Sequence, residues 1–520
     1  MFVRWLAMNG AQAMIRTLVD AGVTTCFSNP GTSEMHFVAA LDAVPEMRGV
    51  LGLFEGVATG AADGYARMTG APACTLLHLG PGLGNGLANL HNARRAATPV
   101  VNIVGDHATY HARFDAPLAS DIDTVARNVS GWIGRPERTE DLCRATAEAV
   151  LAATEPPGQV ATLILPADVS WSDGATPEAP RARSTRAAVS SEVVEQVAKV
   201  LRSGEPVALL LGGSALRREP LRAAARIAAG SGARLFGETF VARTERGAGI
   251  PRVDKIQYFS EMAEQQLAGL RHLVLVDAIS PVTFFAYPGK PSDLVPDGCE
   301  VHVLATGRDD AVAALAAVAE LVGADAETTT GSIAPPSPPS GALTGASLAA
   351  AVAATLPEGA IVCDESNTNS AHMSAATAGC APHDWLQLTG GAIGVGLPLA
   401  TGAAIACPDR TVLALEADGS AMYTIQALWT HAREALDVTT VIMNNRSYAI
   451  LNIELARTGA GAGGPKARDL FDLSRPDLDF VKLAEGMGVP AVAVHTADEA
   501  VAALEDAAAE PGPHLIEAHL

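Results

Sequence analysis

The sequence predicts an α/β protein made of three doubly wound domains, each built on a parallel sheet. Short apolar segments alternate with longer segments of helical periodicity, which is the pattern of buried strands joined by helical crossovers. Two segments rich in proline and small polar residues, 171–186 and 326–343, interrupt this alternation and are predicted to be linkers. The 520 residues therefore divide into domains at 1–170, 187–325 and 344–520, each long enough for its own core.

The strands and helices follow from apolar runs and their spacing. In the first domain, strands are expected near 24–27, 50–54, 73–78 and 100–104, with helices near 34–41, 57–68 and 84–95. The central domain is expected to have strands near 207–211, 272–276 and 301–304. In the third domain, strands are expected near 360–362, 411–415 and 438–443, with a helix at 421–436 between the last two.

The composition excludes several classes of protein. Lys and Arg number 36 against 57 Asp and Glu, a formal net charge of −21, so nucleic acid is not an expected partner. Hydrophobic residues make up 48% and charged residues 18%, which indicates a large buried core and not a disordered chain. No apolar stretch is long enough to cross a membrane. The seven cysteines are scattered and contain no CxxC, so neither a disulfide framework nor a zinc site is expected, and a cytoplasmic location fits best.

Polar side chains follow two strands of the third domain where each strand ends. The strand at 411–416 runs into Asp418, and the strand at 438–443 is followed by Asn445. Open α/β sheets bind ligands at the carboxyl ends of their strands. A carboxylate, an amide oxygen and a nearby backbone carbonyl suit Mg²⁺, which completes its shell with phosphates and water. Gly419 and Ser420 open the next helix, whose free N–H groups attract the same phosphates. The sequence therefore predicts a magnesium–diphosphate site; an ordinary Asp-Gly turn is the alternative.

The segment ADGSAMYTIQALWTHAREALDVTTVIMNNRSYAIL resembles the cofactor motif of thiamine-diphosphate enzymes, which begins with Gly-Asp-Gly and ends in Asn-Asn. The similarity extends over nearly the whole chain and is greatest to benzoylformate decarboxylases and acetohydroxyacid (acetolactate) synthases. It implies a pyrimidine-binding, a central and a diphosphate-binding domain, with thiamine diphosphate and Mg²⁺ as cofactors. By position, Asp418, Asn445 and the carbonyl of Ser447 would hold the metal, and Tyr448 would lie against the diphosphate or the wall of the site. Ala417 stands where the family usually has glycine, and it is expected to be tolerated if its φ is negative.

The same resemblance assigns further cofactor contacts in the third domain. Asn367 and Thr368 follow a predicted strand and would touch the diphosphate; a polar helix cap is the alternative. Gly391 would accept the 4′-amino hydrogen of the pyrimidine through its carbonyl. Ile393 would be the bulky apolar residue that bends the cofactor.

In the first domain, the resemblance assigns the reacting groups. Glu55 ends a predicted strand and would be the activating glutamate that binds the pyrimidine N1′; a helix cap is the alternative. His78, in LHLGPGLGN, matches a histidine of the decarboxylases and would move protons at the substrate; a buried structural histidine is the alternative. Thr32 takes the place of a serine that contacts substrate. The second decarboxylase histidine is absent, with Ala286 near its place, and His107 and His111 are possible substitutes.

Several alternatives remain open at this stage. The loop at 78–85 also resembles a dinucleotide-binding fingerprint, but Asn85 stands where the third glycine belongs, so an NAD-dependent oxidoreductase is a minor alternative. A non-catalytic cofactor-binding paralogue is another. The central domain carries no fingerprint that decides between FAD, a nucleotide and nothing.

The reaction expected is decarboxylation of a 2-oxo acid with release of an aldehyde, which His78 favours. The Gly-Pro-Gly segment and the missing second histidine favour carboligation to a second carbonyl instead. In the family, the activating glutamate and the metal ligands of one site come from different subunits. A homodimer is therefore the minimum assembly, and a homotetramer is expected.

Overall fold

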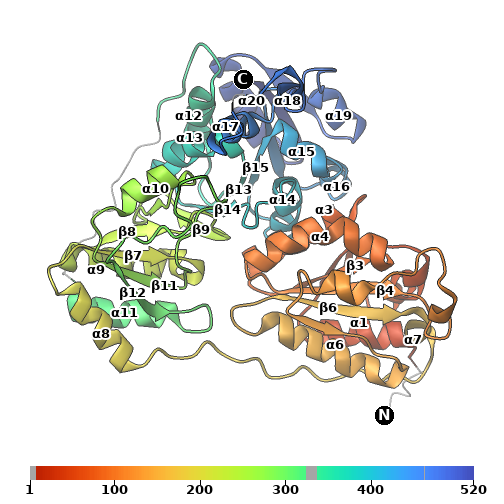
Figure 1. The fold of residues 1–520 in the computed structure, drawn as a ribbon. Helices are drawn as coiled ribbons and strands as arrows, with labels where there is room; N and C mark the ends of the chain where they lie inside the picture. The colour runs from red at the N-terminus through yellow and green to blue at the C-terminus, as the bar shows by residue number, and fades with distance from the viewer. Residues whose placement is uncertain (1–7, 324–335, 462) are drawn as a thin grey trace.

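The computed structural model describes residues 8–323, 336–461 and 463–520, and it contains three sheets, each covered by helices (Figure 1). The three parallel-sheet α/β domains predicted from the sequence are confirmed. Residues 326–335 of the second predicted linker, and the last two residues of the predicted central domain, lie outside the described residues. No described helix combines the length and the apolar character that crossing a membrane requires.

The first sheet has six parallel strands with buried side chains on both faces. Its strands are β1 (Thr25–Asn29), β2 (Arg48–Leu51), β3 (Ala73–Leu77), β4 (Val100–Asp106), β5 (Trp132–Gly134) and β6 (Val160–Pro166). Its helices are α1 (Gly10–Asp20), α2 (Met35–Ala40), α3 (Glu55–Thr69), α4 (Leu79–Arg95), α5 (Ile122–Ala126), α6 (Thr139–Thr154) and α7 (Ala167–Trp171). The strand order is β2-β1-β3-β4-β6-β5. Along β3, Ala73 and Leu77 face one apolar cluster while Cys74 and Leu76 face another, as a strand between two helical layers requires.

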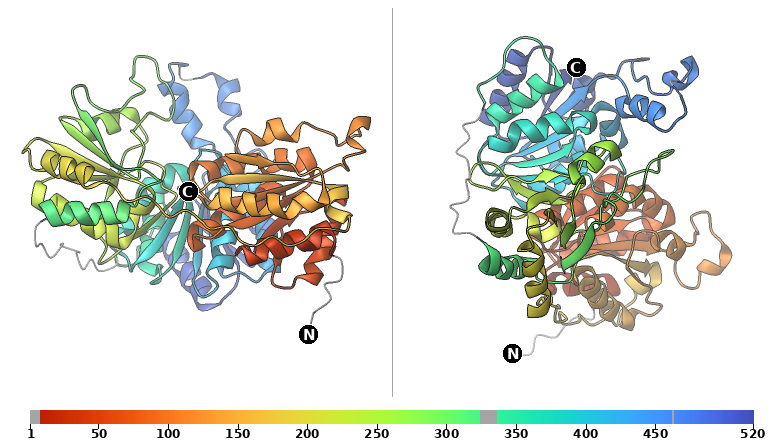
Figure 2. Two further views of the ribbon diagram at one scale, coloured as in Figure 1. Left: turned by 90° about the horizontal axis from the view of Figure 1, so that it is seen from below. Right: turned by 60° about the vertical axis from the view of Figure 1, so that its left-hand side comes forward.

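The central sheet is smaller. Its five strands are β7 (Val207–Leu211), β8 (Arg234–Gly237), β10 (Asp254–Lys255), β11 (His272–Val276) and β12 (Glu300–Ala305), and its helices are α8 (Ser191–Leu201), α9 (Arg218–Ser231), α10 (Ser260–Leu267) and α11 (Ala311–Val322). The strands are parallel, in the order β10-β8-β7-β11-β12. The chain reaches this sheet through an extended segment between α7 and α8, which crosses from the first lobe to the central lobe in Figures 1 and 2.

The third sheet has seven strands. These are β9 (Arg243–Arg246), β13 (Ile361–Glu365), β14 (His383–Gln387), β15 (Val412–Ala417), β16 (Val438–Asn444), β17 (Ala491–Val494) and β18 (His514–His519). Its helices are α12 (Gly345–Thr355), α13 (Ser370–Ala376), α14 (Gly396–Ala406), α15 (Asp418–Thr424), α16 (Ala427–Arg433), α17 (Ala449–Arg457), α18 (Pro465–Asp469), α19 (Phe480–Gly486) and α20 (Ala497–Ala509). The strand order is β17-β18-β16-β15-β13-β14-β9.

The third sheet differs from the sequence predictions, since β14, β17 and β18 were not predicted and two other features were not expected. Strand β9 comes from the chain of the predicted central domain and pairs antiparallel with β14, where Arg243 donates to Asp384 at 2.7 Å. Its sequence, RTER, has no apolar alternation that would mark a strand. The helix predicted at 421–436 was wrong as one element, because α15 and α16 divide at residues 425–426.

The first and third domains touch through α3 and α14, and glycines make this contact close. A Cβ at Gly64 would lie 2.1 Å from the carbonyl oxygen of Leu399, and one at Gly402 would lie 1.9 Å from that of Ala61. The two helices therefore pack backbone against backbone, and any larger side chain at either glycine would separate them.

Arg67, on α3, joins the first domain to the chain around β14 and β9 of the third sheet. Its guanidinium forms a buried ion pair with Asp63, donating to Oδ1 at 2.8 Å and to Oδ2 at 2.5 Å. It also donates to the carbonyl of Gln387 at 2.6 Å, to Oγ1 of Thr389 at 3.1 Å and to the carbonyl of Ala242 at 3.1 Å. The helix that begins at Glu55 is thus fixed to the chain that leads into Gly390 and Gly391.

Candidate active site

Asp418 ties together the carboxyl ends of β15 and β16. Its side chain is 1% exposed, and its two oxygens accept hydrogen bonds from the backbone N–H of Gly419 at 2.8 Å and of Arg446 at 2.6 Å. Burial raises the pKa of Asp418, and these backbone donors oppose that rise. Ala417 precedes it with φ −80°, so the alanine fits without strain, as expected.

Both residues of the Asn-Asn pair contact this loop, and Oδ1 of Asn444 accepts the backbone N–H of Arg446 at 3.2 Å. Asn444 is buried and donates to Oε1 of Glu517 at 2.7 Å. Asn445 is half-buried, and its Oδ1 accepts the backbone N–H of Ser447 at 3.0 Å. Arg446, between Asn445 and Ser447, takes a left-handed φ of +56°, which turns the chain back towards Asp418. The carboxylate, the amide and the backbone of 447 form a set of hard oxygen donors, which fits Mg²⁺.

Tyr448, Ser420 and Asn367 surround the same turn. A Cβ at Gly419 would lie 2.4 Å from Cε1 of Tyr448, so the ring lies directly over that glycine. Asn367, in the short helix η5 (Asn367–Asn369) after β13, donates through Nδ2 to Oγ of Ser420 at 2.7 Å. Thr368 follows and is half-buried. The predicted diphosphate contacts therefore share one edge of the third sheet.

The loop that carries Gly391 is held by the first domain, a feature the sequence did not reveal. Asn92, on α4, donates to the carbonyl of Ala392 at 2.8 Å and accepts the N–H of Gly390 at 3.1 Å. Asn89 donates to the carbonyl of Gly394 at 3.2 Å. Gly391 itself has φ +77°, a conformation that favours glycine. The sequence signal for this contact was weak: Asn89 and Asn92 are three residues apart, so their amides lie on one face of a helix.

Glu365, at the end of β13, holds the far end of that loop. It accepts the backbone N–H groups of Gly394, Val395 and Gly396 at 2.6–2.8 Å. Burial raises the pKa of Glu365 to about 7. Burial, and then the carboxyl of Glu365, raise the pKa of Glu416 well above its usual value, and neither oxygen of Glu416 has a partner among the described residues. Through these three backbone contacts Glu365 sets the loop that leads to Ile393, which is half-buried.

Glu55 begins α3 and is 7% exposed. Its Oε2 accepts a hydrogen bond from Nδ2 of Asn85 at 3.0 Å, while a Cβ at Gly82 would lie 3.2 Å from its Oε1. Helix α4 already begins at Leu79, earlier than predicted, so the glycine-rich segment forms helical turns around a carboxylate. Because a buried acid occupies the place where a dinucleotide phosphate would bind, this geometry argues against the NAD-dependent alternative.

His78 is held by a buried acid, Glu34, that sequence reasoning missed. Nδ1 of His78 lies 2.8 Å from Oε2 of Glu34, which also accepts the N–H of Gly31 at 2.8 Å. Burial raises the pKa of Glu34, and the Gly31 N–H and His78 lower it. A Cβ at Gly31 would lie 2.3 Å from the imidazole, so the ring packs on the turn that carries Thr32, which is exposed. A Cβ at Gly82 would lie 3.4 Å from Cβ of His78, so His78 and Glu55 flank the same glycine.

Aromatic side chains of the central domain reach the Gly391 loop. A Cβ at Gly391 would lie 2.4 Å from Cζ of Phe284. The ring of Phe284 lies 5.3 Å from that of Phe240, 5.6 Å from that of Tyr258 and 4.6 Å from that of Phe285, measured between centroids. Phe284 and Phe285 of this aromatic cluster directly precede Ala286, which was predicted to stand near the place of the second decarboxylase histidine.

His107 and His111 lie beyond the end of β4. Their ring centroids are 5.3 Å apart, and Nε2 of His107 is buried without a partner among the described residues. No hydrogen bond recorded for the described residues joins either ring to Glu55 or His78.

The predicted site residues therefore form two groups. One contains Glu55, His78 and Thr32 on the first domain, and the other surrounds Asp418 on the third. Within the described residues of one chain, no recorded hydrogen bond connects Glu55 with Asp418.

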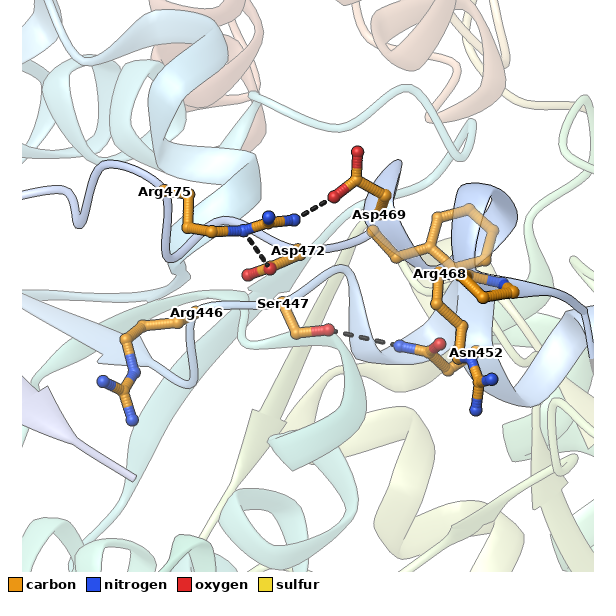
Figure 3. A pocket seen from close by; sticks show the side chains of 9 residues that line it. Arg446, Ser447, Asn452, Arg468, Asp469, Asp472 and Arg475 are labelled. Atoms are coloured by element: carbon orange, nitrogen blue, oxygen red, sulfur yellow. Dashed lines mark hydrogen bonds and ion pairs between the residues drawn. The ribbon is translucent and has the colours of Figure 1, made fainter.

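A cavity of about 500 Å³ adjoins Ser447. Figure 3 shows side chains that line it. Ser447 accepts a hydrogen bond from Asn452 at 3.2 Å on one wall. On another wall, Arg475 pairs with Asp469 and Asp472, so the charge of this arginine is already balanced.

Comparisons with known proteins agree with this geometry. Residues 8–126 match the model of the thiamine pyrophosphate enzyme N-terminal TPP binding domain, and residues 368–518 match that of the C-terminal TPP binding domain. The chain is 62% identical to the "Putative acetolactate synthase large subunit IlvX" of Mycobacterium tuberculosis over 98% of each chain. It is 29% identical to benzoylformate decarboxylase of Pseudomonas aeruginosa, over 95% of this chain and 96% of that one. The solved structure of 4-hydroxybenzoylformate decarboxylase from Rhodococcus jostii superposes with a TM-score of 0.86 at 26% identity, covering 98% of this chain and 99% of the other.

Proposed function

Because the chain belongs to the thiamine pyrophosphate enzymes, we propose that it decarboxylates an aromatic 2-oxo acid and releases the aldehyde. The observation that carries this proposal is the imidazole of His78, fixed by Glu34 on the same glycine that Glu55 contacts. An acid–base group in that position serves the protonation that completes a decarboxylation without a second substrate.

The residues described above divide the work of holding the cofactor. Asp418, Asn445 and the carbonyl of Ser447 would bind Mg²⁺. Residues that would line the diphosphate are Asn367, Thr368, Gly419, Ser420 and Tyr448. When bound, thiamine diphosphate would supply a thiazolium carbon that adds to the 2-oxo acid and a cationic ring nitrogen that takes up the electron pair left by CO₂.

Glu55, Gly391 and Ile393 would orient the pyrimidine ring, and Glu55 would also hold its proton. Glu55 has one oxygen bonded to Asn85, and the other oxygen is available to hold a proton at N1′. The carbonyl of Gly391 would accept the 4′-amino hydrogen, and Ile393 would support the bend between the two rings.

His78 would supply the proton that the product requires. Its Nδ1 is engaged by Glu34, so Nε2 is the nitrogen left for substrate. Thr32, exposed on the adjacent turn, would donate a hydrogen bond to the substrate carboxylate.

The aromatic cluster around Phe284 supports an aromatic substrate. The cluster meets the Gly391 loop through the ring of Phe284, and aromatic rings favour offset or edge-to-face contact with another ring. The structural relative from Rhodococcus jostii is described as acting on 4-hydroxybenzoylformate, an acid of this class.

Carboligation is the second candidate function. The relative that shares 62% identity is named as an acetolactate synthase, and Ala286 offers no side chain that could protonate a product. In that case the same site would join the bound product to a second carbonyl compound, with pyruvate as the simplest donor.

A complete site on this proposal needs two copies of the chain, because Glu55 of one copy would meet Asp418 of the other. We propose a homodimer as the unit of activity and a homotetramer as the assembly, which sedimentation velocity would measure.

The test is a product analysis with three 2-oxo acids: benzoylformate, 4-hydroxybenzoylformate and pyruvate. The proposal expects CO₂ and free aldehyde in equal amounts from the aromatic acids. His78→Gln should lower kcat by about 10²–10⁴-fold, the usual share of an acid–base group. The matched control is His36→Gln, which removes an exposed histidine and should leave turnover unchanged.

Two outcomes would overturn the proposal. Consumption of two pyruvate molecules per CO₂, with acetolactate as the product and no aldehyde, would establish the synthase function instead. Absence of turnover for all three acids in protein that retains bound cofactor would indicate a non-catalytic paralogue.

A further inference from the structure

The central domain carries a pair of histidines at the edge of its sheet. His272 is the first residue of β11, and His302 lies on the neighbouring strand β12. The register pairs His272 with Glu300 and Val274 with His302, so the three polar side chains lie on one face of the sheet. This is the amino end of the strands, opposite the carboxyl end at which α/β sheets bind cofactors.

The nitrogens of the two rings converge. Nδ1 of His272 lies 3.1 Å from Nε2 of His302, and a carboxylate oxygen of Glu300 lies 3.9 Å from each of these nitrogens. Zinc–nitrogen bonds of about 2.0–2.1 Å place two tetrahedral ligands about 3.3 Å apart, close to the separation of the rings. The carboxylate must move about 0.6 Å closer to complete the set, and its side chain is 70% exposed and free to do so.

A second carboxylate already orients one ring. Nε2 of His272 lies 2.9 Å from Oε2 of Glu205, in the turn before β7. With the proton of His272 held at Nε2 by Glu205, the lone pair of Nδ1 points at the space between the rings. Metal-binding histidines commonly give their other ring nitrogen to a carboxylate in this way. The imidazoles are 13% and 11% exposed, so they are largely desolvated while both carboxylates reach solvent.

We propose that His272, His302 and Glu300 bind a divalent transition-metal ion, Zn²⁺ in particular, with water as the fourth ligand. Two imidazoles and one carboxylate are a donor set that zinc uses, and the open fourth position faces solvent. The ion would link β11 to β12 and, through Glu205, to the turn before β7. The scattered cysteines suggested no zinc site, but this one uses no cysteine, and its two histidines are 30 residues apart in the sequence.

The test uses the full chain, saturated with thiamine diphosphate and with excess Mg²⁺ to occupy the cofactor's own metal site. Calorimetric titration with Zn²⁺ should show one equivalent bound by the parent. His302→Gln and Glu300→Gln should each weaken binding at least about tenfold, and Glu205→Gln by about 10–100-fold, the usual effect of an outer carboxylate. The control is His495→Gln, which removes an exposed histidine on another domain and should bind zinc like the parent.

A second measurement separates lost ligands from lost folding. Co²⁺ bound in place of zinc should give the parent the visible absorption of a four-coordinate site, and Glu300→Gln should alter that spectrum. Because the side chain of Glu300 is exposed, the metal-free variant should melt at the same temperature as the metal-free parent. Absence of zinc binding by the parent would overturn the proposal. Equal affinity in the parent and the His302→Gln variant would also overturn it, and would leave the two rings as a hydrogen-bonded pair only.

Discussion

Replacing Arg67 with methionine should weaken the contact between the first domain and the chain that leads into the Gly391 loop. The guanidinium is 2% exposed and pairs with Asp63, which is fully buried. Removing one partner of a buried ion pair costs about 3–5 kcal/mol, because the remaining charge stays buried without compensation. Among the described residues, Asp63 would keep only the hydroxyl of Thr98 as a partner, at 2.7 Å. We therefore expect Arg67→Met to lower the free energy of unfolding by about 3–5 kcal/mol and to weaken cofactor binding.

Chemical denaturation, followed by tryptophan fluorescence and circular dichroism, measures this change. The matched control is Arg48→Met, because Arg48 also pairs across the two domains, with Glu434 at 2.7 Å, but is 48% exposed. An exposed pair contributes about 0–1 kcal/mol, so this control should unfold almost like the parent. The double variant Asp63→Leu, Arg67→Met should lose less than the sum of the single variants, because neither charge remains unpaired. A loss below about 1 kcal/mol for Arg67→Met would refute the reasoning.

Three further predictions concern the cofactor, the pH dependence and flavin. Asp418→Ala should abolish calorimetric binding of thiamine diphosphate with Mg²⁺, and equal affinity in parent and variant would contradict the assignment. Burial lowers the pKa of His431 from 6.5 to about 4, so its contribution to stability is present above pH 6.5 and is lost as the pH falls towards 4. His431→Gln should flatten the fall of the melting temperature over that range, and an unchanged slope would count against it. The purified protein should show no flavin absorption, because Asp277 accepts the N–H of Ser214 at 2.8 Å in the turn where a nucleotide phosphate would bind; a stoichiometric flavin spectrum would disprove this.

Local patterns predicted the three domains and ten of the eighteen described strands, and missed β5, β6, β8, β9, β10, β14, β17 and β18. Strands such as β3 and β16 are buried along their whole length, and the polar residues after β15 and β16, Asp418 and Asn445, mark the carboxyl edge of a sheet. These signals lie within a few residues of each other, so they can be recognised from the sequence alone. The loop predicted to bind the metal and the start of α3 at Glu55 belong to this class.

Contacts between distant segments could not be predicted in this way. Asn92 meets Ala392 across 300 residues, and the acid that orients His78 lies 44 residues before it. Strand β9 was missed for a different reason, since its charged side chains are stabilised by ion pairs with the neighbouring strand, as between Arg243 and Asp384. No periodicity within a segment encodes such partners, because they are set by how the domains pack.

The most direct test of the central claim is hydrogen–deuterium exchange at C2 of bound thiamine diphosphate in Glu55→Gln, beside a binding titration. Glutamine keeps the size of the side chain and some hydrogen bonding, so cofactor affinity should change by only about 1 kcal/mol. The carboxylate that drives proton movement at N1′ is lost, so exchange should slow by about 10²–10⁴-fold. Slow exchange with retained binding is the predicted result. Exchange as fast as in the parent would show that Glu55 is only a helix cap, and loss of binding with normal exchange in the residual complex would assign it a structural role.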